Sequence, residues 1–472
     1  MLLKHYFCKK PKIMNRKLLF PVDDESSDIV KRYEQFLSGT APGYFDVEEL
    51  ESIVEYYLRR GRTKECTKAL ELGLKLHPNN TALKTKRAKI YLATGDDLKA
   101  FRILDKLAEA TDYEVVLLKI EVLIKLDRIK EARVLSENLI AEESDDMDNV
   151  CLDIAFIYLG QGDYLTALKL LEKGDKYNDQ NVDLLYELAF CYEQNEDFAK
   201  AIIVNNRIIS VDPFANEAWF NLGQLYFALQ EFPKALEAYD FALAIDENDS
   251  LSCIQKGHVL FQLDQFEPAI ETYLEYKKMT SYSWQTDIFI AECFEKLERY
   301  DESISYYRLS LDAHTDNYDA LTGIGICLLE QEKYIESMTY IRQALAINEN
   351  AADSWVYLAE GYVGIEDIDN ALMAYIKAIG IDPDQPDTLM AIANICLERM
   401  EYDLCLKYYL AAEKLDDTME FVKLFIAVSY YKKGNLDKAI IYLQKAVKVD
   451  ESAASLFLEL CPEADNLNLL DL

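Results

Sequence analysis

The sequence lacks every common catalytic spacing. It contains no GxxxxGK[ST] phosphate loop, no GxGxxG dinucleotide fingerprint, no GxSxG nucleophile turn and no HExxH zinc motif. Histidine occurs only four times, with no acid or nucleophile at a triad-like spacing. Carboxylates are so frequent that neighbouring pairs are expected from composition, so they support no acid–base assignment. We therefore expect a chain that is not an enzyme and binds no cofactor.

Metal-binding spacings are also missing. Ten cysteines are present, but no two stand in the CxxC arrangement of structural zinc sites. We expect no metal site. The cysteines are expected to act as small apolar residues in a reducing compartment.

Basic residues are scarce beside acidic ones. Lysine and arginine number 50 against 84 aspartates and glutamates, which gives a net charge of −34. Such a field repels nucleic-acid phosphates and anionic lipids, so neither is expected as a direct partner. No stretch approaches the roughly 18 apolar residues of a membrane span. We expect a cytoplasmic protein whose acidity serves either basic partners or simply solubility.

The first residues are the exception to this acidity. Residues 1–20 contain no acid and six basic residues, Lys4, Lys9, Lys10, Lys12, Arg16 and Lys17. They lack the apolar core of about 7 to 15 residues that a signal peptide needs. Met14 offers a second start, so we expect residues 1–22 to be a basic leader that is either not translated or disordered.

A small residue recurs along almost the whole chain and defines a repeat. The series is Cys66, Ala100, Ala132, Ala167, Ala201, Ala235, Ala269, Ser303, Ser337, Ala371, Cys405 and Ala439, and nine of its eleven intervals are identical in length. Twelve positions earlier, a second column is Ala or Gly in ten of the twelve copies. Helices cross closely only where both present small side chains, so the two columns predict a pair of packed helices per repeat.

This pattern resembles the tetratricopeptide repeat, a helix-turn-helix unit of about 34 residues. The copy from Asn216 carries the family's signature residues at Trp219, Leu222, Gly223, Tyr226, Ala235, Tyr239 and Ala242. The copy from Ala352 carries them at Trp355, Leu358, Ala359, Tyr362, Ala371, Tyr375, Ala378 and Pro383. The chain is identified as a multi-repeat array of the bacterial type. The resemblance implies an all-α fold, a right-handed solenoid superhelix of about twelve units with capping helices at both ends.

Counting back from the small residue divides the chain. Repeats are expected to start at residues 47, 81, 113, 148, 182, 216, 250, 284, 318, 352, 386 and 420 and to cover 47–453. An N-terminal capping helix is expected in 23–46, with Asp46 and Glu49 as a capping box for the first repeat. A C-terminal capping helix from Ala453 to Leu460 and a tail complete residues 454–472. The two unequal intervals, on either side of Ala132, predict weaker packing and a bend near residues 110–180.

In the family, the second, fifth, ninth, twelfth and thirteenth residues of each copy line a concave groove. We call these positions the first-helix face. In this sequence they give a candidate partner-binding set in the middle of the array: Tyr186, Phe190, Phe220, Gln224, Phe227, Ile254, His258, Phe261, Glu292 and Glu295. Two interpretations of the rings are open, because exposed aromatics on such a face either bind a ligand or pack on one another across adjacent repeats.

The family's carboxylate clamp of lysine, asparagine and arginine has no counterpart at the matching positions, which hold Tyr186, Phe190, Phe220 and Gln224. We expect a non-catalytic interaction scaffold whose groove binds a protein or peptide segment with apolar and basic residues. The alternative is a targeting or regulatory subunit of an enzyme, secretion or transcription-control assembly. A fold alone does not decide between them.

Overall fold

The computed structural model describes residues 24–40, 44–107, 112–142, 144–280, 283–419 and 421–467. The basic leader and the end of the C-terminal tail lie outside these ranges. Within them the chain forms α-helices and two short 3₁₀ helices, with no strand. By internal contacts the chain divides into two compact units, Met1–Ala218 and Trp219–Leu472.

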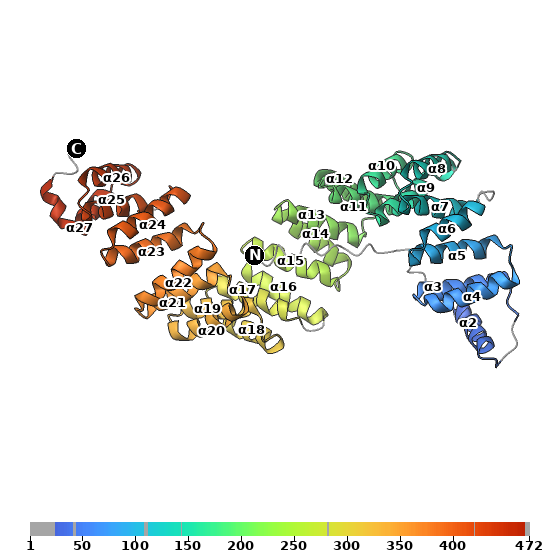
Figure 1. Ribbon diagram of the computed structural model, residues 1–472, viewed down its shortest axis with the longest axis horizontal. Coiled ribbons are helices and arrows are strands. Elements are labelled where there is room, and N and C mark those ends of the chain that lie inside the picture. Colours follow the sequence, from blue (N-terminus) through green and yellow to red (C-terminus); the bar gives the residue numbers. More distant parts are fainter. Residues whose placement is uncertain are drawn as a thin grey trace. The chain divides into compact units, whose positions relative to one another are not determined.

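The described part of the first unit contains α-helices and a short 3₁₀ helix, η2. They are α2 (Asp24–Leu37), α3 (Val47–Arg59), α4 (Thr63–Leu76), α5 (Thr81–Thr94), α6 (Asp97–Lys106), α7 (Tyr113–Lys125), α8 (Ile129–Glu142), η2 (Ser144–Asp146), α9 (Met147–Gly160), α10 (Tyr164–Asp175), α11 (Val182–Gln194) and α12 (Phe198–Val211). Consecutive helices lie side by side, as the blue and green ribbons of Figure 1 show.

The second unit takes up most of α13 (Asn216–Ala228) and all later helices. They are α14 (Phe232–Ile245), α15 (Ser250–Gln262), α16 (Phe266–Met279), α17 (Trp284–Lys296), α18 (Tyr300–Ala313), α19 (Tyr318–Glu330), α20 (Tyr334–Ile347), α21 (Ala352–Gly364), α22 (Ile368–Ile381), α23 (Pro386–Glu398), α24 (Tyr402–Leu415), α25 (Val422–Lys432), α26 (Leu436–Val449), α27 (Ala453–Leu460) and η3 (Pro462–Leu467). Neighbouring helices again pack in sequence order (Figure 1). From α3 onward, odd-numbered helices up to α25 are the first helices of the pairs and even-numbered ones the second.

The small residues of the repeat lie where the two helices of a pair meet. All twelve members of the recurring column are at most 1% exposed. Where this residue is a serine, its side chain donates a hydrogen bond to the carbonyl oxygen twelve positions earlier. Ser303 Oγ donates to Ala291 over 2.9 Å, and Ser337 Oγ donates to Gly325 over 2.7 Å. The all-α repeat architecture expected from the sequence is confirmed.

Irregular helix lengths accompany the two irregular intervals. The shorter interval, from Ala100 to Ala132, begins in α6, which has 10 residues where the second helices of the second unit have 14. The longer interval, from Ala132 to Ala167, includes η2, a single 3₁₀ turn before α9. The bend expected near these elements, and the division of the chain into named repeats, stay predictions.

Both ends of the array are covered by an extra helix. The predicted capping box is present, because Asp46 accepts a hydrogen bond from the Glu49 amide over 2.8 Å and Glu49 accepts one from the Asp46 amide over 3.2 Å. The α2 ring of Tyr33 meets Phe45 edge-on at 5.6 Å. At the other end α27 spans the predicted residues, and its Phe457 packs on Tyr431 at 5.6 Å. Such caps cover the apolar faces that terminal repeats would otherwise expose.

The turn inside every helix pair requires a left-handed backbone. One residue per turn has φ between 56° and 86°, and only four of the twelve are glycine. They are Gly61, Gly95, Asp127, Gly162, Glu196, Gln230, Asp264, Glu298, Glu332, Glu366, Met400 and Gly434. A side chain in this region costs roughly 1 to 2 kcal/mol through the clash of Cβ with the backbone, so most of the turns carry strain.

Replacing one of these residues by glycine should therefore stabilise the fold. We expect Glu332→Gly to raise the free energy of unfolding of its unit by about 0.5 to 1 kcal/mol, measured by urea denaturation. The control is Gln343→Gly at an exposed position inside α20, which should lower it by about 1 kcal/mol. A loss of stability in both variants would contradict the role given to the turn.

Candidate partner-binding site

The predicted site residues divide between the two units. Tyr186 and Phe190 lie on α11 in the first unit, where both side chains are half-buried. The Phe190 ring meets Tyr164 of α10 edge-on at 5.9 Å. The other eight residues lie on α13, α15 and α17 in the second unit, and the site is built from these helices.

Three half-buried phenylalanines mark the first-helix face of α13 and α15. Each of them contacts a ring of the second helix of its own pair. Phe227 packs on Phe232 at 5.4 Å, Phe261 on Phe266 at 5.4 Å, and Phe220 on Tyr239 at 5.9 Å. These contacts lie within one helix pair, whereas the rings of His258 and Tyr273 contact Phe289 of the following pair, so ring packing occurs both within and between repeats. The half-buried rings keep part of their surface in solvent.

His258 is the most deeply buried polar member of the predicted set, at 3% exposure. Its Nδ1 is 2.8 Å from the Tyr273 hydroxyl, and its ring meets Phe289 at 4.7 Å. Desolvation lowers the pKa of His258 to about 4, so the imidazole is neutral near pH 7. Gln224 on α13 and Ile254 on α15 are half-buried. The polar side chains of this stretch are therefore uncharged.

Carboxylates replace the rings on α17. Desolvation, together with the charges of Glu295 and Asp319, raises the pKa of Glu292 to about 7, although Lys296 acts in the opposite direction. Desolvation also raises the pKa of Glu295, although the Tyr307 hydroxyl donates to its Oε2 over 3.1 Å. Among the described residues Glu292 forms no ion pair. The first-helix face of α17 is therefore acidic, and few basic side chains compensate its charge.

The acidic face continues onto Asp319, which the sequence did not single out, and onto Glu360, which the sequence placed among the acids that flank the candidate groove. Desolvation raises the pKa of Asp319 on α19 and of Glu360 on α21, and the charge of Glu330 adds to the effect on Glu360. First helices α17, α19 and α21 contact one another in order. The ninth position of the repeat, shared by Glu292 and Glu360, is the sequence signal that links two of these residues.

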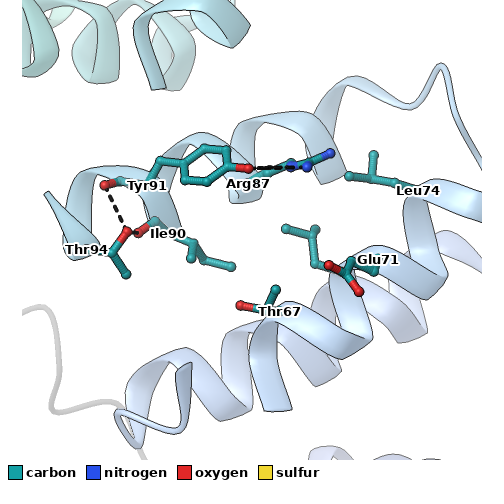
Figure 2. Close-up of a pocket in the computed structure, with 8 residues that line it drawn as sticks. Thr67, Glu71, Leu74, Arg87, Ile90, Tyr91 and Thr94 are labelled. Carbon is teal, nitrogen blue, oxygen red and sulfur yellow. Dashed lines mark hydrogen bonds between the residues drawn. The ribbon is translucent and has the colours of Figure 1, made fainter. Parts of the chain in front are cut away.

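Clefts elsewhere in the described chain are small. One of about 140 Å³ lies between α4 and α5. Figure 2 shows Arg87 in this cleft directed at the Tyr91 hydroxyl, over 3.2 Å from Nη2, and the Thr94 hydroxyl donating to a helix carbonyl. A second cleft, of about 300 Å³ beside α14, α15 and α16, holds the ion pair of Lys256 and Asp240 at 2.8 Å. Ligand pockets run from about 300 to 1,000 Å³, so the first cleft is smaller than this range and the second only reaches its lower limit.

The cysteines and possible metal ligands of the described residues can be compared with the requirements of reactive and metal-binding sites. The nine cysteines within the described residues are buried and unpaired. Burial raises the pKa of the Cys66 thiol to about 11, which removes its nucleophilic form at neutral pH. No group of three or more potential ligands in the described ranges is arranged to hold a metal ion. In the same ranges no helix has the length and apolarity to cross a membrane.

Solved structures with similar helical folds differ widely in sequence. The hetero-tetramer Cut9–Hcn1 of the APC/C is 12% identical, with 86% of this chain and 95% of that chain covered and a TM-score of 0.40. YrrB, a TPR protein with an unusual peptide-binding site, is 20% identical, with 40% and 96% covered and a TM-score of 0.34. PilF of Pseudomonas aeruginosa is 18% identical, with 46% and 98% covered and a TM-score of 0.41.

Family comparisons agree with the helix pairs described above. No curated protein sequence matches the chain. Models of the tetratricopeptide repeat match residues 158–225, 217–249, 290–354 and 422–452, in both units of the structure. These four matches fall on packed helices of the repeat array, and the chain is a tetratricopeptide repeat protein.

Proposed function

We propose that the chain is a non-catalytic scaffold that binds a segment of a partner protein along the first-helix face of its second unit. Tetratricopeptide repeat proteins serve in general as protein-interaction scaffolds, which supports the general role. The groove itself rests on one observation. Half-buried rings lie on the first helices α13 and α15, and the next first helix, α17, carries carboxylates that have raised pKa values and little compensating charge.

The chemistry of this face selects the segment. Apolar side chains would cover the exposed parts of Phe220, Phe227 and Phe261, which are expensive to leave in water when clustered. Lysine or arginine side chains would pair with Glu292 and Glu295, whose partly desolvated charges gain more from a cation than surface carboxylates do. The partner segment therefore carries apolar residues and basic residues, in an extended or helical conformation.

The biological setting of this scaffold is a separate matter. A targeting or regulatory subunit of an enzyme, secretion or transcription-control assembly would use the same face. Cytoplasmic residence, and the contribution of Tyr186 and Phe190 in the first unit, stay predictions from the sequence.

Removing the three rings should abolish capture of the segment. We expect the variant with Phe220→Ala, Phe227→Ala and Phe261→Ala to bind at least about tenfold more weakly, because buried aromatic anchors dominate such interfaces. The probe is an acetylated, amidated peptide in which leucine alternates with lysine, followed by fluorescence anisotropy. The same peptide with glutamate in place of lysine should bind neither protein.

The matched control replaces three exposed apolar residues on second helices of the same unit, Phe241, Ile335 and Met373, by alanine. It should bind the lysine peptide as the unmodified protein does, and both variants should retain their helical circular dichroism. Unchanged binding by the variant without the three phenylalanines would exclude this face as the groove.

The raised pKa of Glu292 predicts a pH-dependent stability. Between the unfolded value near 4.5 and the folded value of about 7, the folded chain holds a proton that the unfolded chain has lost. Stability therefore falls as pH rises through this range. Glu292→Gln removes the buried charge and should raise the melting temperature at about pH 8 while changing it little at about pH 5.

The groups that face this carboxyl are Glu295 and Asp319, with Lys296 as the opposing cation. The control is Glu336→Gln on the exposed side of α20, which should give the same small shift at both pH values. Scanning fluorimetry at the two pH values measures the difference. An equal effect of Glu292→Gln at both would show that this carboxyl is not desolvated.

A further inference from the structure

A column of tyrosines runs along the second helices of the second unit. The twenty-fourth residue of the repeat is tyrosine in five of seven copies, Tyr239, Tyr273, Tyr307, Tyr375 and Tyr409, and all five are at most 6% exposed. We call this set the tyrosine column. A phenol buried this deeply needs a hydrogen-bond partner for its hydroxyl, because an unpaired one costs roughly 1 to 3 kcal/mol.

Three members of the tyrosine column find that partner on a first helix. The Tyr273 hydroxyl meets His258 Nδ1 at 2.8 Å, and the Tyr307 hydroxyl donates to Glu295 Oε2 over 3.1 Å. The Tyr409 hydroxyl donates to Asn394 Oδ1. All three partners occupy the ninth or twelfth position of their repeat. The hydroxyls of the column therefore reach the layer directly under the first-helix face.

Tyr239 is different. Its side chain is completely buried, and its hydroxyl has no hydrogen-bond partner among the described residues. The ring packs directly on the backbone of Gly223, because a Cβ atom added there would lie only 2.5 Å from the Tyr239 Cε1. The ninth and twelfth positions of this repeat are Gln224 and Phe227, and neither bonds the hydroxyl.

A second buried polar atom without a partner among the described residues lies on the first helix of the following repeat. Sister tyrosines lie against the sixth residue of the following first helix, as Tyr273 stacks on Phe289 at 5.6 Å and Tyr409 on Phe425 at 5.8 Å. For Tyr239 that residue is Gln255, whose Oε1 is buried and has no partner within the described residues. By this register, an unpaired donor on α14 and an unpaired acceptor on α15 belong to neighbouring positions of the array.

On the first-helix face of α13, the second position is the exposed acid Glu217, and the fifth, ninth and twelfth positions are uncharged. Phe220, Gln224 and Phe227 on α13 are uncharged, whereas α17 presents Glu292 and Glu295. Gln224 is half-buried and forms no hydrogen bond with another described residue, so its side chain can move aside without losing one. A charged side chain of a partner would lose its hydration here without gaining an opposite charge. Neutral amide groups fit, because a peptide unit offers one acceptor and one donor.

We propose that Tyr239 and Gln255 bind the main chain of an extended, uncharged stretch of the partner segment, with the phenol donating to a carbonyl oxygen and the carboxamide oxygen accepting from an N–H. This inference rests on the proposed function and divides the segment into two parts. The apolar, uncharged part lies over α13 and α15, and the basic part lies over α17 and the helices that follow.

The test uses the full chain and a defined probe. The probe is an acetylated, amidated peptide in which leucine alternates with threonine before a run of lysines, and binding is measured by fluorescence anisotropy. Tyr239→Phe removes only the hydroxyl and should weaken binding by about fivefold to tenfold, the value of one hydrogen bond. Its melting temperature should stay the same or rise, because an unpaired buried group is lost.

Tyr273→Phe is the matched control. It removes a hydroxyl that His258 already pairs, so it should lower the melting temperature and leave the affinity for the peptide within about twofold. A reverse pattern, with Tyr239→Phe binding as the unmodified protein does, would overturn the inference and leave the hydroxyl to an ordered water. If the three phenylalanine substitutions abolish binding and Tyr239→Phe does not, the groove stands and only the main-chain contact fails.

A second arm tests the acceptor. Replacing one main-chain amide of the leucine–threonine stretch by an ester removes a single N–H, and at one position in the scan this should weaken binding to the unmodified protein. The same ester should have no effect on Gln255→Leu, because the acceptor is then already missing. An ester effect that persists in Gln255→Leu contradicts the assignment. Self-association of the chain that Tyr239→Phe abolishes would identify a second copy as the occupant and also contradict it.

Discussion

The close approach of the two helices in each pair is the constraint on which the other features depend. A small residue on each helix allows the backbones to meet, and at two of the first-helix glycines a ring from the second helix fills the space. At Gly223 and Gly257 an added Cβ would lie 2.5 and 2.4 Å from a carbon of the facing tyrosine. The same contact carries the phenol across the pair to the first-helix face, so the packing rule of the fold also supplies the polar groups beneath the candidate groove.

Much of the architecture could be predicted because its signals are periodic. A small residue equivalent to Ala235 recurs in all twelve repeats and one equivalent to Gly223 in ten of them, and a regular spacing of that kind survives the wide variation of other positions. The capping box at Asp46 was predictable for a different reason, since its two partners, Asp46 and Glu49, lie within one helical turn of each other in sequence. Features set by local or periodic contacts are the ones that a single sequence reveals.

The chemistry of the site was harder to predict from the sequence, because it depends on contacts between residues of different helices. The repeat register places His258 on the first-helix face, but whether its ring turns outward depends on Tyr273 and Phe289, which belong to two other helices. The unpaired hydroxyl of Tyr239 cannot be recognised in the sequence either. Tyr273, Tyr307 and Tyr409 have a polar partner for the hydroxyl fifteen or twelve positions earlier, and whether a residue at those positions bonds the hydroxyl is decided only in the folded structure. Desolvation of Glu292 results from helices that contact one another only in the folded array.

The buried cysteines can report local unfolding, because of the repeat architecture. A solenoid is held together mainly by contacts between neighbours in sequence, so its parts can open with different free energies. Cys66, Cys151, Cys191, Cys253, Cys293, Cys327, Cys396, Cys405 and Cys461 are distributed over both units, and each is sealed from solvent in the closed state. Each thiol becomes reactive only when the helices that bury it separate. The rate at which each cysteine reacts with a thiol reagent would therefore report the local unfolding of its part of the chain.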